Sequence, residues 1–549
     1  MVHCSFNKRH LTLIWAVMEC LFFTGIVFGW SWLSVTLRRD RYFLDLCNIT
    51  LEEDVPDVLP NTVLNTDMLT ELETPIIRTN INKNKSRRKC RPRKKWRTTT
   101  PPYEYEVYDS FPLNDSRYFC DEQEERLDIV NAIVLIIRHG LLLPLGIFLD
   151  AYGTTRTRLI AVLTFAIGTL VMTFSNASFP WLVIPAFSLI SLAGLVILLT
   201  NIQVSNLFGS RRNTVMGSLI GAYHSSAIIL LAMKETHSSH METQTSFMFL
   251  TIGVVPILVS TIAFLPKSRI PWPLPAGYGK HGEAWKESSG SKRSNGQGPS
   301  KSSSNFATFR IVACSSVYIW SVIWFAIYNL RSFTYDGNVR LMLMKYGVAK
   351  ENVYTYTELY ALLLLTALPF GPCIGAILDW RRKANAANDP PIQQMQNILF
   401  ALVVTFLFAL ANNILPTIPS LAFQVLGFVL QTGERVAVGT CLCAFVSHVN
   451  FPIEHFGKLI GLHFAVASIV SLLRFPFQSF ITTSLHGDPF YINLLLLVLL
   501  LVSCGHPINL WYHCRLGLIR DTSNSERDRN TANEQLVSED VVIAAEGTP

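Results

Sequence analysis

The chain has 549 residues, of which 50% are hydrophobic and only 15% are charged. A soluble globular protein carries about 25% charged residues, so this composition excludes most soluble classes and predicts a protein built for a lipid bilayer. The net charge of +7 does not indicate a nucleic-acid partner, because Lys and Arg collect on the cytoplasmic loops of integral membrane proteins.

Long apolar runs alternate with short polar loops along most of the chain. Windows of about 19 residues predict an all-α membrane protein with about twelve spans, each near the 20 residues that cross the hydrocarbon core. The predicted spans are 11–35, 127–149, 158–176, 180–205, 214–234, 246–266, 309–333, 354–378, 397–415, 419–443, 458–485 and 490–514.

The short loops predict the orientation. Their basic residues fall on one side: Arg156, Arg158, Arg211, Arg212, Arg381, Arg382, Lys383 and Lys458. By the positive-inside rule this side is cytoplasmic, so both termini are expected in the cytoplasm of a multi-pass plasma-membrane protein. The basic run Lys83–Arg97 lies in the first loop and argues the other way, but loops longer than about 60 residues translocate largely regardless of charge.

Composition divides the chain into two helical halves. Residues 1–266 are predicted to form a six-helix bundle that carries a long extracellular first loop, 36–126. A Gly-, Ser- and Lys-rich segment, 267–308, reads as a flexible cytoplasmic linker. Residues 309–515 form the second predicted bundle, and 516–549 a polar, disordered cytoplasmic tail.

The first loop carries signs of an oxidising, extracellular compartment. Its predicted glycosylation acceptors are Asn48, Asn84 and Asn114. Cys47 and Cys120 bracket the insertion, so a disulfide that closes it is expected, with Cys90 as a competing partner.

One motif occurs at equivalent places in the two halves. The second span ends in Gly146-Ile-Phe-Leu-Asp150-Ala-Tyr-Gly153-Thr-Thr-Arg156-Thr-Arg158, and the eighth ends in Gly375-Ala-Ile-Leu-Asp379-Trp380-Arg381. The glycine lets a neighbouring helix approach, and the aspartate can pair with the arginines or face the N-terminus of a helix from the other half. The motif resembles the signature loop of the major facilitator superfamily. That resemblance implies two six-helix bundles that rock about a central site, with these loops as a cytoplasmic latch.

Longer segments resemble solute carrier family 43. They include Glu19-Cys-Leu-Phe-Phe, Gly29-Trp30, Asn206-Leu-Phe-Gly209, Gly221-Ala-Tyr223 and His455-Phe-Gly457. That family holds large-neutral-amino-acid facilitators and an equilibrative nucleobase transporter, and segments such as Asp45-Leu-Cys47 and Asp488-Pro-Phe-Tyr491 favour the nucleobase branch. The resemblance implies facilitative, sodium-independent transport of purine nucleobases such as adenine, guanine and hypoxanthine. Transport of large neutral amino acids is the alternative, and a non-transporting receptor or scaffold is a further one.

Polar and aromatic side chains within spans are the candidates for a substrate site, because an intramembrane ionisable group is a functional candidate by default. They are Glu19, Trp30, Asn201, Gln203, His224, Ser225, Trp324 and Arg435. Each also has a structural interpretation that the sequence leaves open.

Glu19 fits proton binding or substrate contact, and equally a structural pair with a basic residue on another span. The amides of Asn201 and Gln203 suit either the edge of a neutral base or a helix–helix hydrogen bond. His224, followed by Ser225, fits either a narrowed pocket or pairing with a neighbour.

The remaining candidates are equally open. Trp30 and Trp324 fit stacking on a planar ring or ordinary packing. Arg435 fits contact with a substrate carboxylate or with a base carbonyl.

Two further charges, Glu434 and Arg474, occupy positions where the relatives look uncharged. They lie on adjacent predicted spans at similar depth, which leads to the hypothesis of a buried ion pair. Arg474 lining the cavity is the alternative.

Other functional classes find little support. The sequence contains no zinc-ligand spacing, phosphate-binding loop or nucleophile elbow, so no enzymatic activity, metal or cofactor is expected. The expected partners are a small-molecule substrate and the lipid bilayer, with no nucleic acid and no obligate protein partner.

Overall fold

The computed structural model describes residues 2–47, 120–239, 241–265, 269–272, 274, 309–380, 391–418, 420–448 and 451–516. Several predictions concern residues outside these ranges: the acceptors Asn48, Asn84 and Asn114, the latch residue Arg381, and most of the linker and the tail. The described residues are mostly helical and contain no β-strand, which confirms the all-α fold class.

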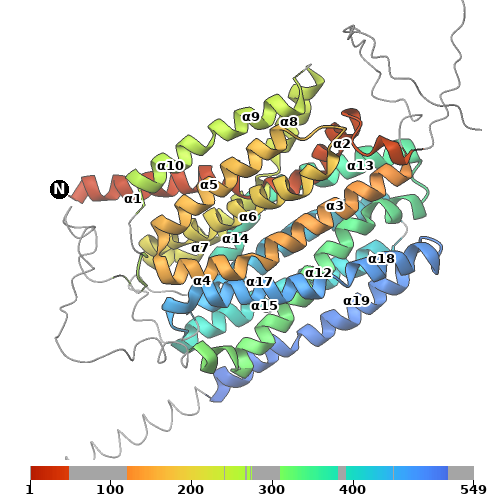
Figure 1. Cartoon of the computed structure of the whole chain (residues 1–549). Helices are drawn as coiled ribbons and strands as arrows, with labels where there is room; N and C mark the ends of the chain where they lie inside the picture. The colour runs from red at the N-terminus through yellow and green to blue at the C-terminus, as the bar shows by residue number, and fades with distance from the viewer. Residues whose placement is uncertain are drawn as a thin grey trace, which may run out of the picture. The chain divides into compact units, whose positions relative to one another are not determined.

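Figure 1 colours the described helices in chain order, from red at the N-terminus to blue. Short 3₁₀ or π segments are named η in the text. The described elements of the first half are α1 (Val2–Glu19), η1 (Cys20–Thr24), η2 (Ile26–Gly29), α2 (Trp30–Arg39), η3 (Leu44–Leu46), α3 (Asp121–Gly140), α4 (Leu142–Tyr152), α5 (Thr154–Thr173), η5 (Pro180–Leu182), α6 (Val183–Ile202), η6 (Gln203–Arg211), α7 (Arg212–Ser225), α8 (Ile228–Ser238), α9 (Thr243–Ile252) and α10 (Val254–Ala263).

The second half is built in the same way. Its elements are α12 (Ser316–Lys345), α13 (Lys350–Leu363), η7 (Leu364–Thr366), α14 (Ala367–Leu378), α15 (Pro391–Ile414), η9 (Leu415–Thr417), α16 (Leu421–His448), η10 (Ile453–His455), α17 (Phe456–Ser471), α18 (Arg474–Thr483) and α19 (Phe490–Ser503).

Within the described ranges, nine helices are long and apolar enough to cross a membrane, or ten when the bent pair Lys8–Thr24 and Ile26–Arg39 counts as one span. The sequence predicts about twelve. The difference has two physical causes. The continuous helical stretch Pro180–Ser238 contains two of the predicted spans, and α12 carries Tyr, Asn, Arg and Asp side chains that lower its hydropathy.

The first span is broken at Gly25, where its two parts meet at 45°. A Cβ atom on Gly25 would lie 1.7 Å from the carbonyl oxygen of Tyr223, so only glycine permits this approach of α7. The break is followed by η2 and α2, which place Phe28 of η2 and Trp30 of α2 between the two halves.

The two halves touch closely at one end of the helical body. Here α7 packs against α14, and α4 packs against α17. A Cβ atom on Gly217 would lie 2.1 Å from the carbonyl oxygen of Gly371, and one on Gly146 would lie 2.1 Å from that of Gly457. Backbone therefore meets backbone across the halves, as small residues permit in membrane helix pairs.

The same end carries the two motif aspartates, and we call it the latch end. Asp150 accepts hydrogen bonds from the backbone N–H groups of Gly457 (2.8 Å) and Lys458 (2.7 Å) at the start of α17. Asp379 accepts them from Asn213 (3.2 Å) and Thr214 (2.7 Å) at the start of α7. Each aspartate thus caps a helix of the other half, where the helix dipole favours negative charge.

The other motif residues divide into two groups. Gly153 ends α4 with a φ of +79°, a conformation that favours glycine, and Gly375 lies against the backbone of Asn213. The two arginines differ. Arg156 is exposed beside the ring of Tyr152, whereas Arg158 is fully buried and contacts neither aspartate. The prediction that Arg158 belongs to the latch is therefore wrong, because α5 turns its side chain into the core of the first half.

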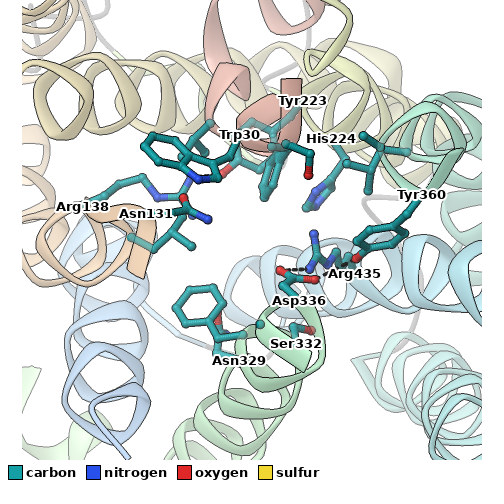
Figure 2. Close-up of a pocket in the computed structure, with 18 of the residues that line it drawn as sticks. Trp30, Asn131, Arg138, Tyr223, His224, Asn329, Ser332, Asp336, Tyr360 and Arg435 are labelled. Atoms are coloured by element: carbon teal, nitrogen blue, oxygen red, sulfur yellow. Dashed lines mark hydrogen bonds and ion pairs between the residues drawn. The ribbon is translucent and has the colours of Figure 1, made fainter. Parts of the chain in front are cut away.

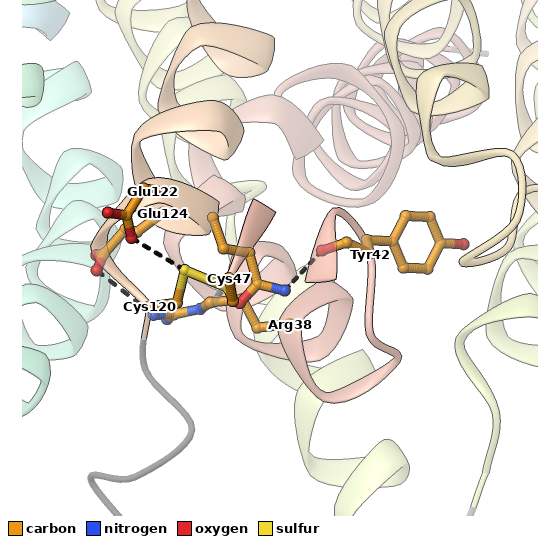
Figure 3. The surroundings of a disulfide bond; sticks show 7 residues. Arg38, Tyr42, Cys47, Cys120, Glu122 and Glu124 are labelled. Carbon is orange, nitrogen blue, oxygen red and sulfur yellow. Dashed lines mark hydrogen bonds and ion pairs between the residues drawn. A yellow bond between two sulfur atoms is a disulfide. The ribbon is translucent and has the colours of Figure 1, made fainter. Parts of the chain in front are cut away.

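The opposite end carries a disulfide between Cys47 and Cys120, and we call it the disulfide end (Figure 3). The Cα atoms of these cysteines are 5.8 Å apart, and the bond joins the segment after α2 to the start of α3. The side chain of Gln123 donates a hydrogen bond to the backbone carbonyl of Tyr42 at 2.6 Å. Burial raises the pKa of Tyr42 to about 12, so its hydroxyl stays neutral and bonds with Ser175.

Removing this disulfide is expected to destabilise the disulfide end. The bond closes a segment with a sequence separation of 73, and such a crosslink contributes about 2–4 kcal/mol through the entropy of the unfolded chain. The double variant Cys47→Ser/Cys120→Ser should lower the apparent melting temperature of the detergent-purified protein. Cys314→Ser, which changes an exposed free cysteine, is the control. Equal melting temperatures for all three proteins would contradict the prediction.

Candidate functional site

A cavity of about 220 Å³ lies between the two halves and is lined by helices from both (Figure 2). Its wall reaches Arg38 and Glu124 near the disulfide end. None of the latch contacts of Asp150 or Asp379 belongs to its lining. The described conformation is therefore closed at the latch end, and the cavity extends toward the disulfide end.

The polar residues that line the cavity recur along their helices at the spacing of one helical face. Along α3 the cavity face consists of Glu124, Asp128, Asn131, Leu135 and Arg138, separated by alternating steps of four and three residues. Residues at this spacing lie on one side of a helix, so α3 presents charged and amide groups along the full depth of the cavity.

The lining residues of the facing helix, α12, show the same spacing of three and four residues. Its cavity side includes Asn329, Ser332 and Asp336. Figure 2 shows these three below the open centre of the cavity, opposite Trp30 and His224. Asp336 forms an ion pair with Arg435 of α16 and accepts a hydrogen bond from Tyr360 of α13 at 2.7 Å.

Phe28 holds two arginines at the inner part of the cavity. The guanidinium of Arg138 lies 5.6 Å from the centre of its ring, and that of Arg435 lies 5.9 Å away. Arg138 also donates a hydrogen bond to the hydroxyl of Tyr223 at 3.1 Å. The ring of His224 lies 4.6 Å from that of Phe28, so cations and aromatic rings alternate here.

Several polar atoms of the wall are buried and lack a hydrogen-bond partner among the described residues. They are the indole N–H of Trp30, the carbonyl oxygen of Asn131, Nε of Arg138 and of Arg435, Nδ1 of His139 and of His224, and the hydroxyl of Tyr328. Buried polar groups are nearly always paired, so unpaired ones that line a cavity are available to a bound molecule.

Two charged groups of the wall also lack a bonded partner within the described chain. Arg474 begins α18 and is 8% exposed, and Asp128 lies on the cavity face of α3. Their charges act on each other, yet no ion pair within 4.0 Å joins them.

The two halves also interact at the disulfide end. Lys234 of α8 forms an ion pair with Glu358 of α13 at 2.5 Å. Glu124 of α3 forms an ion pair with Arg340 of α12 and accepts a hydrogen bond from Tyr354 of α13 at 3.0 Å. Polar contacts therefore narrow this end of the cavity, whereas packed backbone closes the other.

The eight candidate residues separate into two sets. Trp30, His224 and Arg435 line the cavity. The other five lie elsewhere, which corrects the prediction that they contact a bound molecule there: Glu19, Asn201, Gln203, Ser225 and Trp324.

Glu19 and Asn201 belong to a buried network around Arg158. The Nη2 atom of Arg158 donates to both carboxylate oxygens of Glu19, at 2.9 and 2.8 Å, and its Nη1 atom donates to Asn201 at 2.7 Å. Asn201 donates to Glu19 at 2.8 Å, and Ser260 also donates to that carboxylate. The polar groups of this network satisfy one another's hydrogen bonds. Glu19 and Arg158 therefore form a structural ion pair within the first half.

The remaining three candidates make local contacts. Gln203 accepts a hydrogen bond from Thr154 at 3.0 Å, and Ser225 donates to the backbone carbonyl of Leu365 at 3.2 Å. Trp324 packs on Tyr328, with ring centres 5.1 Å apart. These are the structural interpretations that the sequence left open.

The hypothesis of a Glu434–Arg474 pair is wrong. Glu434 pairs with Arg331 of α12 at 2.5 Å and accepts a hydrogen bond from Asn412 at 3.2 Å. The side chain of Arg474 instead lies against Gly337, on the cavity side of α12. The two side chains therefore have different surroundings, and Glu434 has another cation as its partner.

Sequence reasoning missed several lining residues, among them Asn131, Asp336 and Tyr360. Asp336 lies three residues beyond the predicted end of its span at 333, whereas α12 continues to Lys345. The sequence feature that could have indicated Asp336 is an acidic residue just past the end of an apolar window. No group of three or more His, Cys, Asp or Glu side chains that could hold a metal ion occurs in the described part of the chain.

Comparison with known proteins identifies the family. The model of the Major Facilitator Superfamily matches residues 129–473, which is more than half of the chain. The chain belongs to the Major Facilitator Superfamily. Two paired halves with a cavity between them are what the superfamily resemblance implies, and facing the N-terminus of a helix is one of the two roles that the motif left open for the aspartates.

Relatives extend over almost the whole chain. Equilibrative nucleobase transporter 1 of Bos taurus is 26% identical, covering 93% of this chain and 97% of the relative. The large neutral amino acids transporter small subunit 3 is 24% identical in Mus musculus and 23% identical in Homo sapiens, covering 93% of this chain and 94% of each relative. The chain is therefore similar to two kinds of superfamily transporter.

Proposed function

We propose that this chain is a facilitative, sodium-independent transporter of purine nucleobases such as adenine, guanine and hypoxanthine, which works by alternating access. The similarity to an equilibrative nucleobase transporter along nearly the full length supports this proposal. The cavity between the halves supports a central site of the kind that superfamily transporters use.

The observation that carries the proposal is a set of neutral, unpaired hydrogen-bonding groups in the wall of the cavity. A nucleobase is planar and uncharged, so it needs a stacking surface and a few donors and acceptors. Trp30 offers an indole ring and a free N–H, Asn131 offers a free carbonyl oxygen, and His224 offers a ring with a free nitrogen.

Large neutral amino acids are the second candidate, favoured by a different observation. Asp128 and Arg474 carry opposite charges without a bonded partner in the described chain. A zwitterion presents a carboxylate and an ammonium, which such a pair would match. The relatives that are named as large neutral amino acids transporters support this candidate.

The proposed cycle starts from the described conformation. With the latch end closed, a solute enters from the disulfide end. Opening of the glycine contacts at the latch end then releases it on the other side. We propose that the latch end faces the cytoplasm, that both termini lie there, and that the protein resides in the plasma membrane; the basic residues near the latch end support this orientation.

The test is uptake of radiolabelled adenine and of radiolabelled leucine in separate assays, at neutral pH without sodium. Cells that express the chain are expected to take up adenine saturably and to take up no more leucine than matched control cells. Surface biotinylation establishes delivery to the plasma membrane. Leucine uptake alone would overturn the nucleobase proposal in favour of the second candidate, and uptake of neither solute by delivered protein would overturn both.

A further inference from the structure

Arg474 is a buried cation in the cavity that nothing in the described chain binds. It is 8% exposed and has neither a hydrogen bond nor an ion pair among the described residues. Its guanidinium lies so close to α12 that a Cβ atom at Gly337 would be 2.6 Å from Nη2. Glycine at that position leaves room for the planar group, which is therefore held in place by packing and not by a partner.

Asp128 is the matching anion. It lies on the cavity face of α3, between Glu124 and Asn131, and its side chain is exposed to the cavity. No hydrogen bond or ion pair engages it in the part of the chain that the structure describes. Asp128 and Arg474 face one cavity without touching. The space between them therefore has hydrogen-bond donors on the side of Arg474 and acceptors on the side of Asp128.

The other charges around the cavity already have partners among the described residues. Arg138 donates a hydrogen bond to the hydroxyl of Tyr223, and the others form ion pairs. Arg435 pairs with Asp336, and Glu358 pairs with Lys234. Glu124 pairs with Arg340. A charge that is already paired offers less to a solute, since binding must first break the existing contact. Asp128 and Arg474 are therefore the charged groups that a bound solute can engage at the lowest cost.

We infer that Asp128 and Arg474 form a subsite that selects 6-oxopurines, such as hypoxanthine and guanine, over adenine. This inference rests on the proposed nucleobase function and adds a preference among purines. Arg474 would donate to O6 and N7 of the base, and Asp128 would accept from N1–H.

The hydrogen-bonding edges of the purines explain the preference. A 6-oxopurine presents two adjacent acceptors, O6 and N7, which match the two N–H groups of a guanidinium. It also presents a donor at N1, which suits a carboxylate. Adenine presents an amino donor at position six and an acceptor at N1, so it would set donor against donor at Arg474 and acceptor against carboxylate at Asp128. A site built for hydrogen bonds rejects an analogue that cannot make them.

The test measures how unlabelled hypoxanthine and unlabelled adenine inhibit the uptake of radiolabelled adenine in cells that express the full chain. In the wild type, less hypoxanthine than adenine is expected to halve the uptake. With Arg474→Gln or Asp128→Asn, the hypoxanthine concentration that halves uptake should rise about tenfold, while the adenine concentration stays unchanged or falls. Adenine inhibition is the internal reference, because it reports folding and delivery of each variant.

Two variants outside the cavity serve as matched controls: Arg515→Gln in the helical segment after α19 and Asp45→Asn near the disulfide end, both exposed. They should leave both concentrations unchanged. Arg474→Lys provides a second variant in case Arg474→Gln does not reach the surface, since it keeps the charge near Asp128 but loses the planar pair of donors. Its expected shift is smaller and in the same direction.

The outcomes separate the subsite from the proposed function. If the wild type takes up adenine but the variants shift both purines by the same factor, or neither, the subsite is wrong while the proposed function stands. If the wild type takes up no purine, the proposed function itself is wrong. Inhibition by leucine that disappears in Arg474→Gln would overturn the 6-oxopurine assignment, because the pair would then bind a zwitterion.

Discussion

Arg158→Ala is expected to destabilise the protein by about 3–5 kcal/mol and to remove most of it from the cell surface. Arg158 is fully buried, and its donors are engaged by Glu19, Asn201 and the hydroxyls of Thr200, Ser260 and Thr261. Truncation leaves the carboxylate of Glu19 buried without its cation. It also removes the donors on which several neighbouring polar groups depend.

The measurement is the apparent melting temperature in detergent, together with the amount of folded protein at the cell surface. Arg156→Ala is the matched control, because Arg156 is two residues earlier on the same helix and exposed. The double variant Glu19→Gln/Arg158→Met should be more stable than Arg158→Ala, since no charge remains buried alone. If Arg158→Ala melts like the wild type and only transport is lost, the pair has a transport role and the structural assignment fails.

Gly217→Ala is expected to lower transport at least about tenfold while the protein still folds. The new Cβ atom would lie 2.1 Å from the carbonyl oxygen of Gly371, so α7 and α14 cannot approach as they do in the described conformation. Overpacking of this kind costs about 1–3 kcal/mol, and here it falls only on the conformation in which the latch end is closed. The balance should shift toward the conformation in which that end is open.

Uptake and accessibility together test this prediction. A cysteine introduced at Ser332, which lines the cavity, reports access of an impermeant thiol reagent from outside the cell. Gly217→Ala should reduce its labelling, because an open latch end implies a closed disulfide end in an alternating-access cycle. Gly140→Ala is the control, since its Cβ atom would meet only the hydroxyl of Ser468 at 3.4 Å. Unchanged uptake and labelling in Gly217→Ala would show that the halves tolerate a wider separation.

The contacts that close the latch end could be anticipated from the sequence. The recurrence of a glycine one turn before an aspartate indicated close helix approach, and facing a helix N-terminus was one of two roles considered for the aspartates. Asp150 and Asp379 have that role in the structure. Helix type and the paired halves were also predictable, because hydropathy and repetition are local properties of a chain.

The site could be predicted only in part, because a side chain's direction depends on how neighbouring helices pack. Glu19 was a candidate by its depth alone, and its cation, Arg158, was assigned to a loop that the structure includes in α5. Glu434 and Arg474 were expected at similar depth, but depth does not fix the direction of a side chain, and the partner of Glu434 is Arg331. Asp336 fell beyond an apolar window that ended before its helix did.

The ion pair between Asp150 and Arg269 bears on the energetic symmetry of the transport cycle. When the latch end opens, Asp150 loses the two N–H donors of α17, and a carboxylate stripped of all partners would make that state costly. Arg269 lies at the start of the segment that follows the first half, and the next residue, Ile270, accepts a hydrogen bond from Asn206 of that half, so Arg269 can stay beside the aspartate and keep its charge balanced. A carrier that runs in either direction needs end states of similar free energy, and this retained partner helps to keep them level.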